Sequence, residues 1–237
     1  MGMSVAVLAS GGKDSTLALH RVLREGYEVE YLVAMFPLRE DSWMFHYPNI
    51  RLVDLFAEAV GIPLVKGETS GVKERELEDL KRLVATLHVE GLVSGAIASN
   101  YQKTRIWDIC RQLRLHCIAP LWHENPYNIL MEILDLNLEV VITGVCAHGF
   151  TEEWLGRKID EATVVDLMEL HRRYGLSPVG EGGEYETLVL DAPFFKKRIT
   201  ITESEKVWKG QSGCFMVKKA KLERKWDSSK QGVKYQC

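Results

Sequence analysis

The sequence predicts an α/β protein in which a doubly wound parallel sheet is followed by a smaller α+β domain. In the first half, short apolar runs typical of buried strands alternate with amphipathic segments typical of helices. Such alternation indicates parallel strands with helices on both faces of the sheet. Beyond Pro120 and Pro126 the alternation gives way to strand-like runs that follow one another. We therefore expect two domains, residues 1–124 and residues 125–237.

Each expected element of the first domain has its own signal. The strands are apolar, the helices carry apolar residues at helical spacing, and Gly61 is placed to end one helix. Strands are expected at 5–8, 28–36, 62–65, 92–94 and 115–118, and helices at 16–23, 49–60, 73–88 and 101–113. Because the loops after parallel strands meet at one edge of the sheet, we expect a ligand site at that edge.

The second domain shows fewer helices and longer strands. Helices are expected at 128–136 and 160–174, and strands at 139–145, 187–190, 198–207 and 215–222. The helix at 160–174 is strongly amphipathic, and Gly175 is placed to end it. The last residues, 227–237, are polar, and we expect them to fray.

Composition excludes several classes of protein. With 237 residues, 46% of them apolar, and a formal net charge of −3, the chain has no basic character to suggest stable binding of nucleic acid. No apolar run is long enough to span a bilayer, so no membrane partner is expected. The five cysteines form no CxxC pair, which argues against a zinc site and for a reducing, cytoplasmic environment. A catalytic thiol stays open.

The segment Ser10–Ser15, SGGKDS, is the most informative part of the chain. It lies between an expected strand and an expected helix, where glycines let a backbone approach a phosphate and free N–H groups point at it. Ser10 and Ser15 add hydroxyl donors, Lys13 adds a positive charge, and Asp14 is a candidate metal ligand. The spacing differs from that of a Walker loop. The alternative is a glycine turn that only caps a helix.

Two more segments are candidates for a site. Residues 180–187, GEGGEYET, combine three glycines with three carboxylates directly before an apolar strand. Burying carboxylates together is costly unless a cation compensates, so a bland acidic turn is the less favoured reading. Residues 94–105 run from a strand end into a helix, where Gly95 permits close approach and Arg105 suits a phosphate. A capped helix with a surface arginine explains that second segment equally well.

SGGKDS resembles the PP-loop of the N-type ATP pyrophosphatases. Taken together with SGAIASNYQKTR and GEGGEYETLVLDAP, in this order, it resembles the diphthine–ammonia ligase family over roughly residues 4 to 222. The pairs Phe45-His46 and Leu121-Trp122 also fit that family's pattern. The resemblance implies a HUP-type nucleotide-binding sheet and an ATP-dependent amidation. The carboxylate of diphthine on translation elongation factor 2 would be adenylated, and ammonium would supply the nitrogen, with release of AMP and pyrophosphate.

The resemblance also implies roles for single residues. Lys13, Asp14, Glu184 and Glu186 would be catalytic, and Asp14 would hold Mg²⁺. ATP would be bound by Ser10, Gly11, Gly12, Lys13, Asp14, Ser15, Ala34, Met35, Gly95 and Arg105. The substrate side would comprise His46, Ser99, Tyr101, Gln102, Gly182, Gly183, Glu184, Glu186 and Thr187.

Two other functions remain open from the residues. One is a different PP-loop adenylating enzyme that modifies tRNA or a small molecule, although the weak overall charge and the lack of a CxxC pair argue against tRNA thiolation. The other is an ATP-binding sensor without turnover, in which the acidic GEGGEYET segment would have no obvious purpose. The sequence leaves open whether the chain forms a homodimer.

Overall fold

The computed structural model describes residues 2–37, 49–69 and 73–225. His46 therefore lies outside the described residues, and so do the side chains of Tyr101 and Gln102. Among the described helices, none is long and apolar enough to cross a membrane.

The first sheet is parallel, as predicted, and its strand order places the expected ligand edge. In space the strands lie in the order β3-β2-β1-β4-β5, and every described pair is parallel. The chain thus builds outward from β1 in one direction and then restarts beside it with β4. The strands are β1 (Ser4–Leu8), β2 (Glu28–Pro37), β3 (Leu64–Thr69), β4 (Gly91–Val93) and β5 (His116–Ile118).

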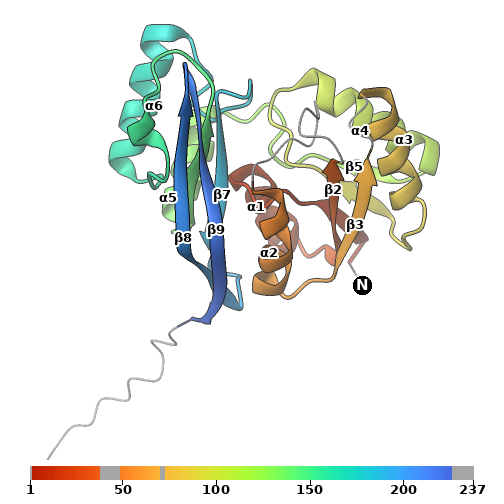
Figure 1. Cartoon of the computed structure of the whole chain (residues 1–237). Coiled ribbons are helices and arrows are strands. Elements are labelled where there is room, and N and C mark those ends of the chain that lie inside the picture. Colours follow the sequence, from red (N-terminus) through yellow and green to blue (C-terminus); the bar gives the residue numbers. More distant parts are fainter. Residues whose placement is uncertain (1, 38–48, 70–72, 226–237) are drawn as a thin grey trace, which may run out of the picture.

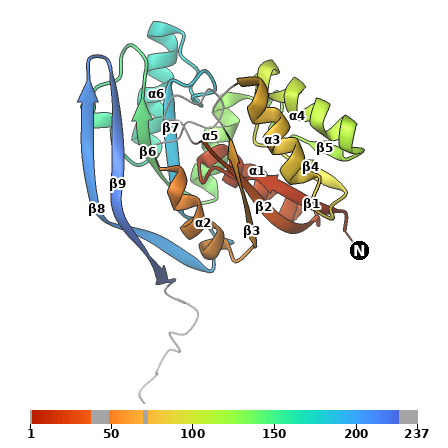
Figure 2. The same ribbon diagram turned by 45° about the vertical axis from the view of Figure 1, so that its right-hand side comes forward.

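Helices cover both faces of this sheet, which confirms the doubly wound arrangement. Figures 1 and 2 show α1 and α2 on the face toward the second sheet, and α3 and α4 on the opposite face. On that opposite face, Leu80 and Ile106 pack with Ala6, Met35 and Leu92 of the strands in a separate buried cluster. The helices are α1 (Lys13–Arg24), α2 (Val53–Val60), α3 (Lys73–Val84) and α4 (Asn100–Leu113), with a short 3-10 turn η1 (Ile50–Leu52) before α2.

The second part of the chain forms an antiparallel sheet flanked by two helices. Its strands lie in the order β7-β6-β9-β8, and β8 and β9 form a long hairpin that extends along one side of the molecule (Figure 1). The elements are α5 (Pro126–Asp135), β6 (Glu139–Val145), η2 (Glu152–Trp154), α6 (Glu161–Tyr174), β7 (Tyr185–Asp191), β8 (Lys197–Lys209) and β9 (Ser212–Arg224).

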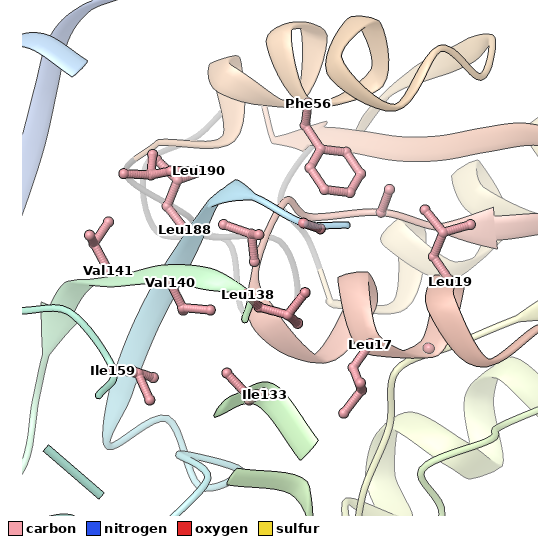
Figure 3. Packing of buried hydrophobic residues seen from close by; sticks show 14 of the residues in the cluster. Leu17, Leu19, Phe56, Ile133, Leu138, Val140, Val141, Ile159, Leu188 and Leu190 are labelled. Carbon is pink, nitrogen blue, oxygen red and sulfur yellow. The ribbon is translucent and has the colours of Figure 1, made fainter. Parts of the chain in front are cut away.

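The two sheets share one hydrophobic core. Leu17 and Leu19 on α1 and Phe56 on α2 belong to the same buried cluster as Val140 on β6 and Leu188 on β7 (Figure 3). Helix α1 is therefore buried on more than one side and contributes to the packing of both the parallel sheet and the second part of the chain. The boundary between residues 124 and 125 stays a prediction, since the structure shows the two parts joined by packing as well as by the chain.

Most expected elements lie within a few residues of their predicted positions, and three differences have clear causes. Helix α1 begins at Lys13 rather than Thr16, because the last residues of SGGKDS form its first turn. The third strand is Leu64–Thr69 rather than 62–65, since Ile62-Pro63 leads into it. Helix α3 ends at Val84, and the next N–H groups form turns, such as that from Thr86 N–H to the Leu83 carbonyl.

Candidate functional site

The site lies where the strand order of the parallel sheet reverses, between β1 and β4. The loops that follow these two strands leave the sheet at the same edge, where ligands of such sheets bind. They touch there. A Cβ atom added to Gly95 would lie 2.8 Å from the carbonyl carbon and oxygen of Asp14 and 2.9 Å from the Ser15 nitrogen. Glycine at 95 is thus required for the β4–α4 loop to pack on the start of α1.

The SGGKDS loop is closed by hydrogen bonds among its own groups. The Ser10 hydroxyl accepts from the Gly12 N–H at 3.2 Å and lies 3.2 Å from the Ser15 hydroxyl, which donates to the Gly12 carbonyl at 3.1 Å. Gly11 has φ of +78°, a conformation that favours glycine. Gly12 precedes α1 and has no side chain that could cap it, and the N-terminal end of a helix is a favourable place for an anion.

Lys13 is buried, with 2% of its side chain exposed, and it links the two halves of the molecule. Its Nζ donates to both carboxylate oxygens of Asp14 at 2.9 Å and to the Val179 carbonyl at 2.5 Å. It also lies 5.1 Å from the centre of the Tyr185 ring. Burial alone would lower the pKa of Lys13, but the charges of Asp14 and its other acidic neighbours raise it above its usual value. The ammonium therefore stays charged at neutral pH.

Strand β7, which carries the end of GEGGEYET, is joined directly to the SGGKDS loop. The Lys13 backbone N–H donates to the Thr187 hydroxyl at 3.1 Å, and the Val189 N–H donates to the Gly11 carbonyl at 2.9 Å. A Cβ atom at Gly12 would lie 3.3 Å from the Thr187 carbonyl oxygen. The Thr187 side chain thus contacts the SGGKDS loop, and the substrate-side role expected of Thr187 stays a prediction.

Glu186 is a carboxylate of the site whose pKa is strongly raised. It lies on β7 opposite Gly144 of β6, and a Cβ atom at that glycine would be 3.4 Å from the Glu186 Cβ. Burial raises the pKa of Glu186 to about 7, Lys13 opposes that rise, and Asp14 adds to it. A carboxyl group that titrates near neutral pH inside a site is suited to general base or acid chemistry.

Glu184 shapes the glycine-rich loop that precedes β7. One carboxylate oxygen accepts from the Ser177 N–H and the other from the Gly182 N–H, both at 2.8 Å. Gly183 has φ of +81°, which allows the chain to turn between these contacts. Both oxygens thus hold the loop closed, and the expected catalytic role of Glu184 stays a prediction.

Glu181 was not singled out from the sequence, yet it bridges the two halves of the site. Its Oε1 accepts from three successive N–H groups of the β4–α4 loop, those of Ile97 at 3.3 Å, Ala98 at 3.0 Å and Ser99 at 2.7 Å. Ser99 therefore enters the site through its backbone. The only sequence signal for Glu181 was its membership of the acidic segment, since its partners lie more than 80 residues away.

The adenine-side candidates lie on β2. Ala34 and Met35 are each 2% exposed and pair with Lys66 and Gly67 of β3. On their other side, the pairing with β1 ends one residue earlier, at Val33. The backbone of Ala34 and Met35 thus lies beyond the end of its pairing with β1, at the ligand edge of the sheet. The contact of these two residues with adenine stays a prediction. Arg105 is half-buried on α4, and its contact with a phosphate also stays a prediction.

The residues present fit Mg²⁺ in one particular way. The described ranges contain no group of three or more His, Cys, Asp or Glu side chains arranged to hold a metal ion. Asp14 has 33% of its side chain exposed beside the SGGKDS loop. Mg²⁺ is commonly held by one or two carboxylates together with substrate phosphates and water, and a single partly exposed carboxylate suits that mode.

Comparison with known proteins identifies the family of both parts of the chain. Residues 3–117 match the diphthamide synthase N-terminal domain, and residues 125–223 match the diphthamide synthase C-terminal domain. The chain is 37% identical over 228 residues to the diphthine–ammonia ligase of Rattus norvegicus, which covers 86% of this chain and 85% of that protein. This chain belongs to the diphthamide synthase family. The resemblance inferred from the three motifs is thus confirmed, and the chain is a ligase.

Two other diphthine–ammonia ligases are also similar to this chain. The diphthine–ammonia ligase of Homo sapiens is 35% identical, with 86% of this chain and 85% of that protein covered. That of Schizosaccharomyces pombe is 36% identical over 92% of this chain but 39% of its own length. Among solved structures, a predicted subunit of tRNA methyltransferase from Methanocaldococcus jannaschii covers 81% of this chain and 98% of its own, with 14% identity and a TM-score of 0.45.

Proposed function

We propose that this chain catalyses the ATP-dependent amidation of diphthine on translation elongation factor 2, with ammonium as the nitrogen source. One observation carries the proposal. The phosphate-type loop and the strand of GEGGEYET form a single site, joined by the bonds from Lys13 to Thr187 and Val179 and from Val189 to Gly11. A ligase that forms an amide through an adenylate needs both a phosphate-binding loop and a proton acceptor. Glu186 would be the proton acceptor, next to the SGGKDS loop.

The phosphate side of the proposed reaction follows from α1. The N–H groups at the start of the helix would bind phosphate oxygens of ATP, and the buried charge of Lys13 adds to the positive field there. These groups are fixed before substrate arrives, so they stabilise developing charge without rearrangement. Asp14 would hold Mg²⁺, which when bound would neutralise phosphate charge.

Activation of the acid precedes the attack by nitrogen. The diphthine carboxylate oxygen attacks the α-phosphorus, the bond to the bridging oxygen breaks, and pyrophosphate leaves with that electron pair. The mixed anhydride then carries AMP, which is a far better leaving group than hydroxide. The protein mainly has to hold the carboxylate in line with the α-phosphate, which is a task of positioning rather than of nucleophilic side chains.

Glu186 would act in the second step. Ammonium first loses one proton to water to give ammonia, which attacks the acyl carbon; the new C–N bond forms, and AMP leaves with the electrons of the broken C–O bond. The nitrogen must then lose one proton, and the Glu186 carboxylate would take it. A pKa of about 7 leaves Glu186 able to accept that proton at neutral pH and to release it afterwards.

A product assay tests the proposal. The full chain is incubated with labelled ATP, ammonium and diphthine-bearing elongation factor 2, with the factor omitted in a parallel sample. AMP and pyrophosphate formed only with the factor, together with the mass change from acid to amide, would support the ligase. ADP and phosphate as products, or AMP formed without amide, would refute it.

The partner, the compartment and the assembly belong to the same proposal. An elongation factor as acceptor implies reaction in the cytoplasm, where translation takes place. No residue of the described site requires a second copy of the chain, so we propose that one chain suffices for turnover. An activity that depends on protein concentration in the range where a dimer forms would contradict this.

A further inference from the structure

The three carboxylates of GEGGEYET have three different environments. Glu184 binds N–H groups within its own loop, and Glu186 is partly buried on β7. Glu181 instead leaves its own domain and binds the loop between β4 and α4. Two of the three are thus accounted for by loop folding and by proton transfer, and the long-range contact of Glu181 needs its own explanation.

Glu181 binds the β4–α4 loop through one carboxylate oxygen that accepts several hydrogen bonds. A single oxygen, Oε1, accepts three backbone N–H groups, the shortest at 2.7 Å from Ser99. Hydrogen bonds to an ionised acceptor are roughly twice as strong as neutral ones. The N–H groups also precede the first turn of α4, where a negative charge is favoured. The loop 97–99 is therefore held in one conformation by a residue of the second domain.

The Glu181 contact completes a closed ring around the site. From Glu181 the ring runs to residues 97–99, then back along the loop to Gly95, which packs on the backbone of Asp14. Next to Asp14, Lys13 returns to the second domain through the Val179 carbonyl, two residues before Glu181. Every link is a direct contact between described residues. Loss of the Glu181 bonds would release the β4–α4 loop from the glycine-rich loop while the contacts of Gly95 and Lys13 remain.

We propose that Glu181 is a positioning residue that sets the β4–α4 loop and the SGGKDS loop at the correct distance from β7. This inference rests on the proposed amidation, because it assigns to Glu181 the alignment of the phosphate side with Glu186. Glu181 does not touch the reacting atoms in this assignment. Its effect is on the geometry in which the activated acid meets nitrogen, and a displacement of about 1 Å at such a site costs roughly a hundredfold in rate.

Three variants of Glu181 and one control test the proposal in the full chain. Glu181→Ala removes the acceptor, Glu181→Asp shortens it, and Glu181→Gln keeps an oxygen that accepts N–H groups. Glu153, exposed on η2 near the second sheet, supplies the control Glu153→Ala. The kcat for amide formation, the KM for ATP and the melting temperature are measured for each, and hydrogen exchange is followed for the peptide that contains 97–99.

The expected result is a split between kcat and KM. Glu181→Ala and Glu181→Asp lose roughly ten- to a hundredfold in kcat with little change in the KM for ATP, and their 97–99 peptide exchanges faster. Glu181→Gln recovers most of the loss, and Glu153→Ala matches wild type. A Glu181→Ala variant that keeps wild-type kcat, or whose loss of activity follows its loss of folded protein, overturns the proposal.

Failure of the proposed function is recognised separately. If wild-type protein forms no amide, the amidation is refuted, and the positioning role for that reaction falls with it. Hydrogen exchange in the ligand-free protein then still decides whether Glu181 holds the loop. Unchanged exchange at 97–99 in Glu181→Ala refutes the link itself, whatever reaction the site catalyses.

Discussion

The substitution Glu186→Gln tests whether a buried carboxyl group has been kept at a cost to stability. In the folded chain the pKa of Glu186 is raised from 4.5 to about 7, first by burial and then by Asp14. That difference corresponds to roughly 3 kcal/mol, at about 1.4 kcal/mol for each pH unit. Because the folded state binds the proton more tightly than the unfolded state does, the folded state loses stability as pH rises from 4.5 through 7.

Glutamine at 186 carries no charge at any pH, so the variant should escape this loss. At pH 8 we expect Glu186→Gln to be more stable than wild type by up to roughly 3 kcal/mol, and at pH 4 we expect a difference near zero. Denaturant unfolding followed by circular dichroism at both pH values measures the two differences. The variant Glu153→Gln, at an exposed position on η2, is compared with wild type at the same two pH values as the control.

The same variant should lose activity. Removal of a general base lowers the rate about a hundred- to ten-thousandfold. The kcat for amide formation by Glu186→Gln should therefore fall by that factor relative to wild type. Wild-type kcat should rise with pH and level off above about 7. The reasoning is refuted if the stability difference is the same at pH 4 and pH 8, or if glutamine at 186 leaves the rate and its pH profile unchanged.

Three further predictions concern other parts of the fold. Asp14→Ala should abolish amidation and lower stability by roughly 1–3 kcal/mol, because the buried Lys13 ammonium then loses its carboxylate partner and keeps the Val179 carbonyl. Asp14→Asn should retain most of the stability. Product assays measure the activity of both variants, and thermal melts measure their stability. Gly95→Ala should raise the KM for ATP several-fold, because the added methyl group meets the Asp14 backbone at 2.8 Å, and a wild-type KM would contradict that contact. Burial and the charge of Arg24 lower the pKa of His20 from 6.5, so stability should fall as pH drops below 6.5, and His20→Phe, which keeps the stacking on Phe194, should fall less between pH 7 and pH 5.

The fold was predictable because its signals are local. Apolar runs such as Val5–Leu8 and the helical spacing of 160–174 need no partner to be recognised, and α6 indeed spans Glu161–Tyr174 with a left-handed Gly175 at its end. The start of α1 was missed by three residues for a physical reason. Gly12 caps the helix without a side-chain bond, so the N-cap position carries none of the residues Ser, Thr, Asp or Asn that most clearly mark a helix start.

The site was predictable in composition but not in wiring. SGGKDS and GEGGEYET were both recognised, yet no local pattern shows that Lys13 N–H binds Thr187, 174 residues away. Glu181 was missed for the same reason. The raised pKa of Glu186 arises first from its desolvation on β7, where it pairs with Gly144 of β6, and a sequence does not show which of several carboxylates will be desolvated.

Because α1, α2, β6 and β7 share one core, the half of the chain that carries SGGKDS is poorly suited to be expressed alone. Expressed without residues 125–237, it would lose part of this core, including Phe195, whose ring packs edge-on against that of Phe56. Contiguous apolar patches that become exposed drive aggregation. A chimaera that joins this half to a different second domain would therefore have to reproduce the packing surface of β6 and β7, and not merely a linker of suitable length.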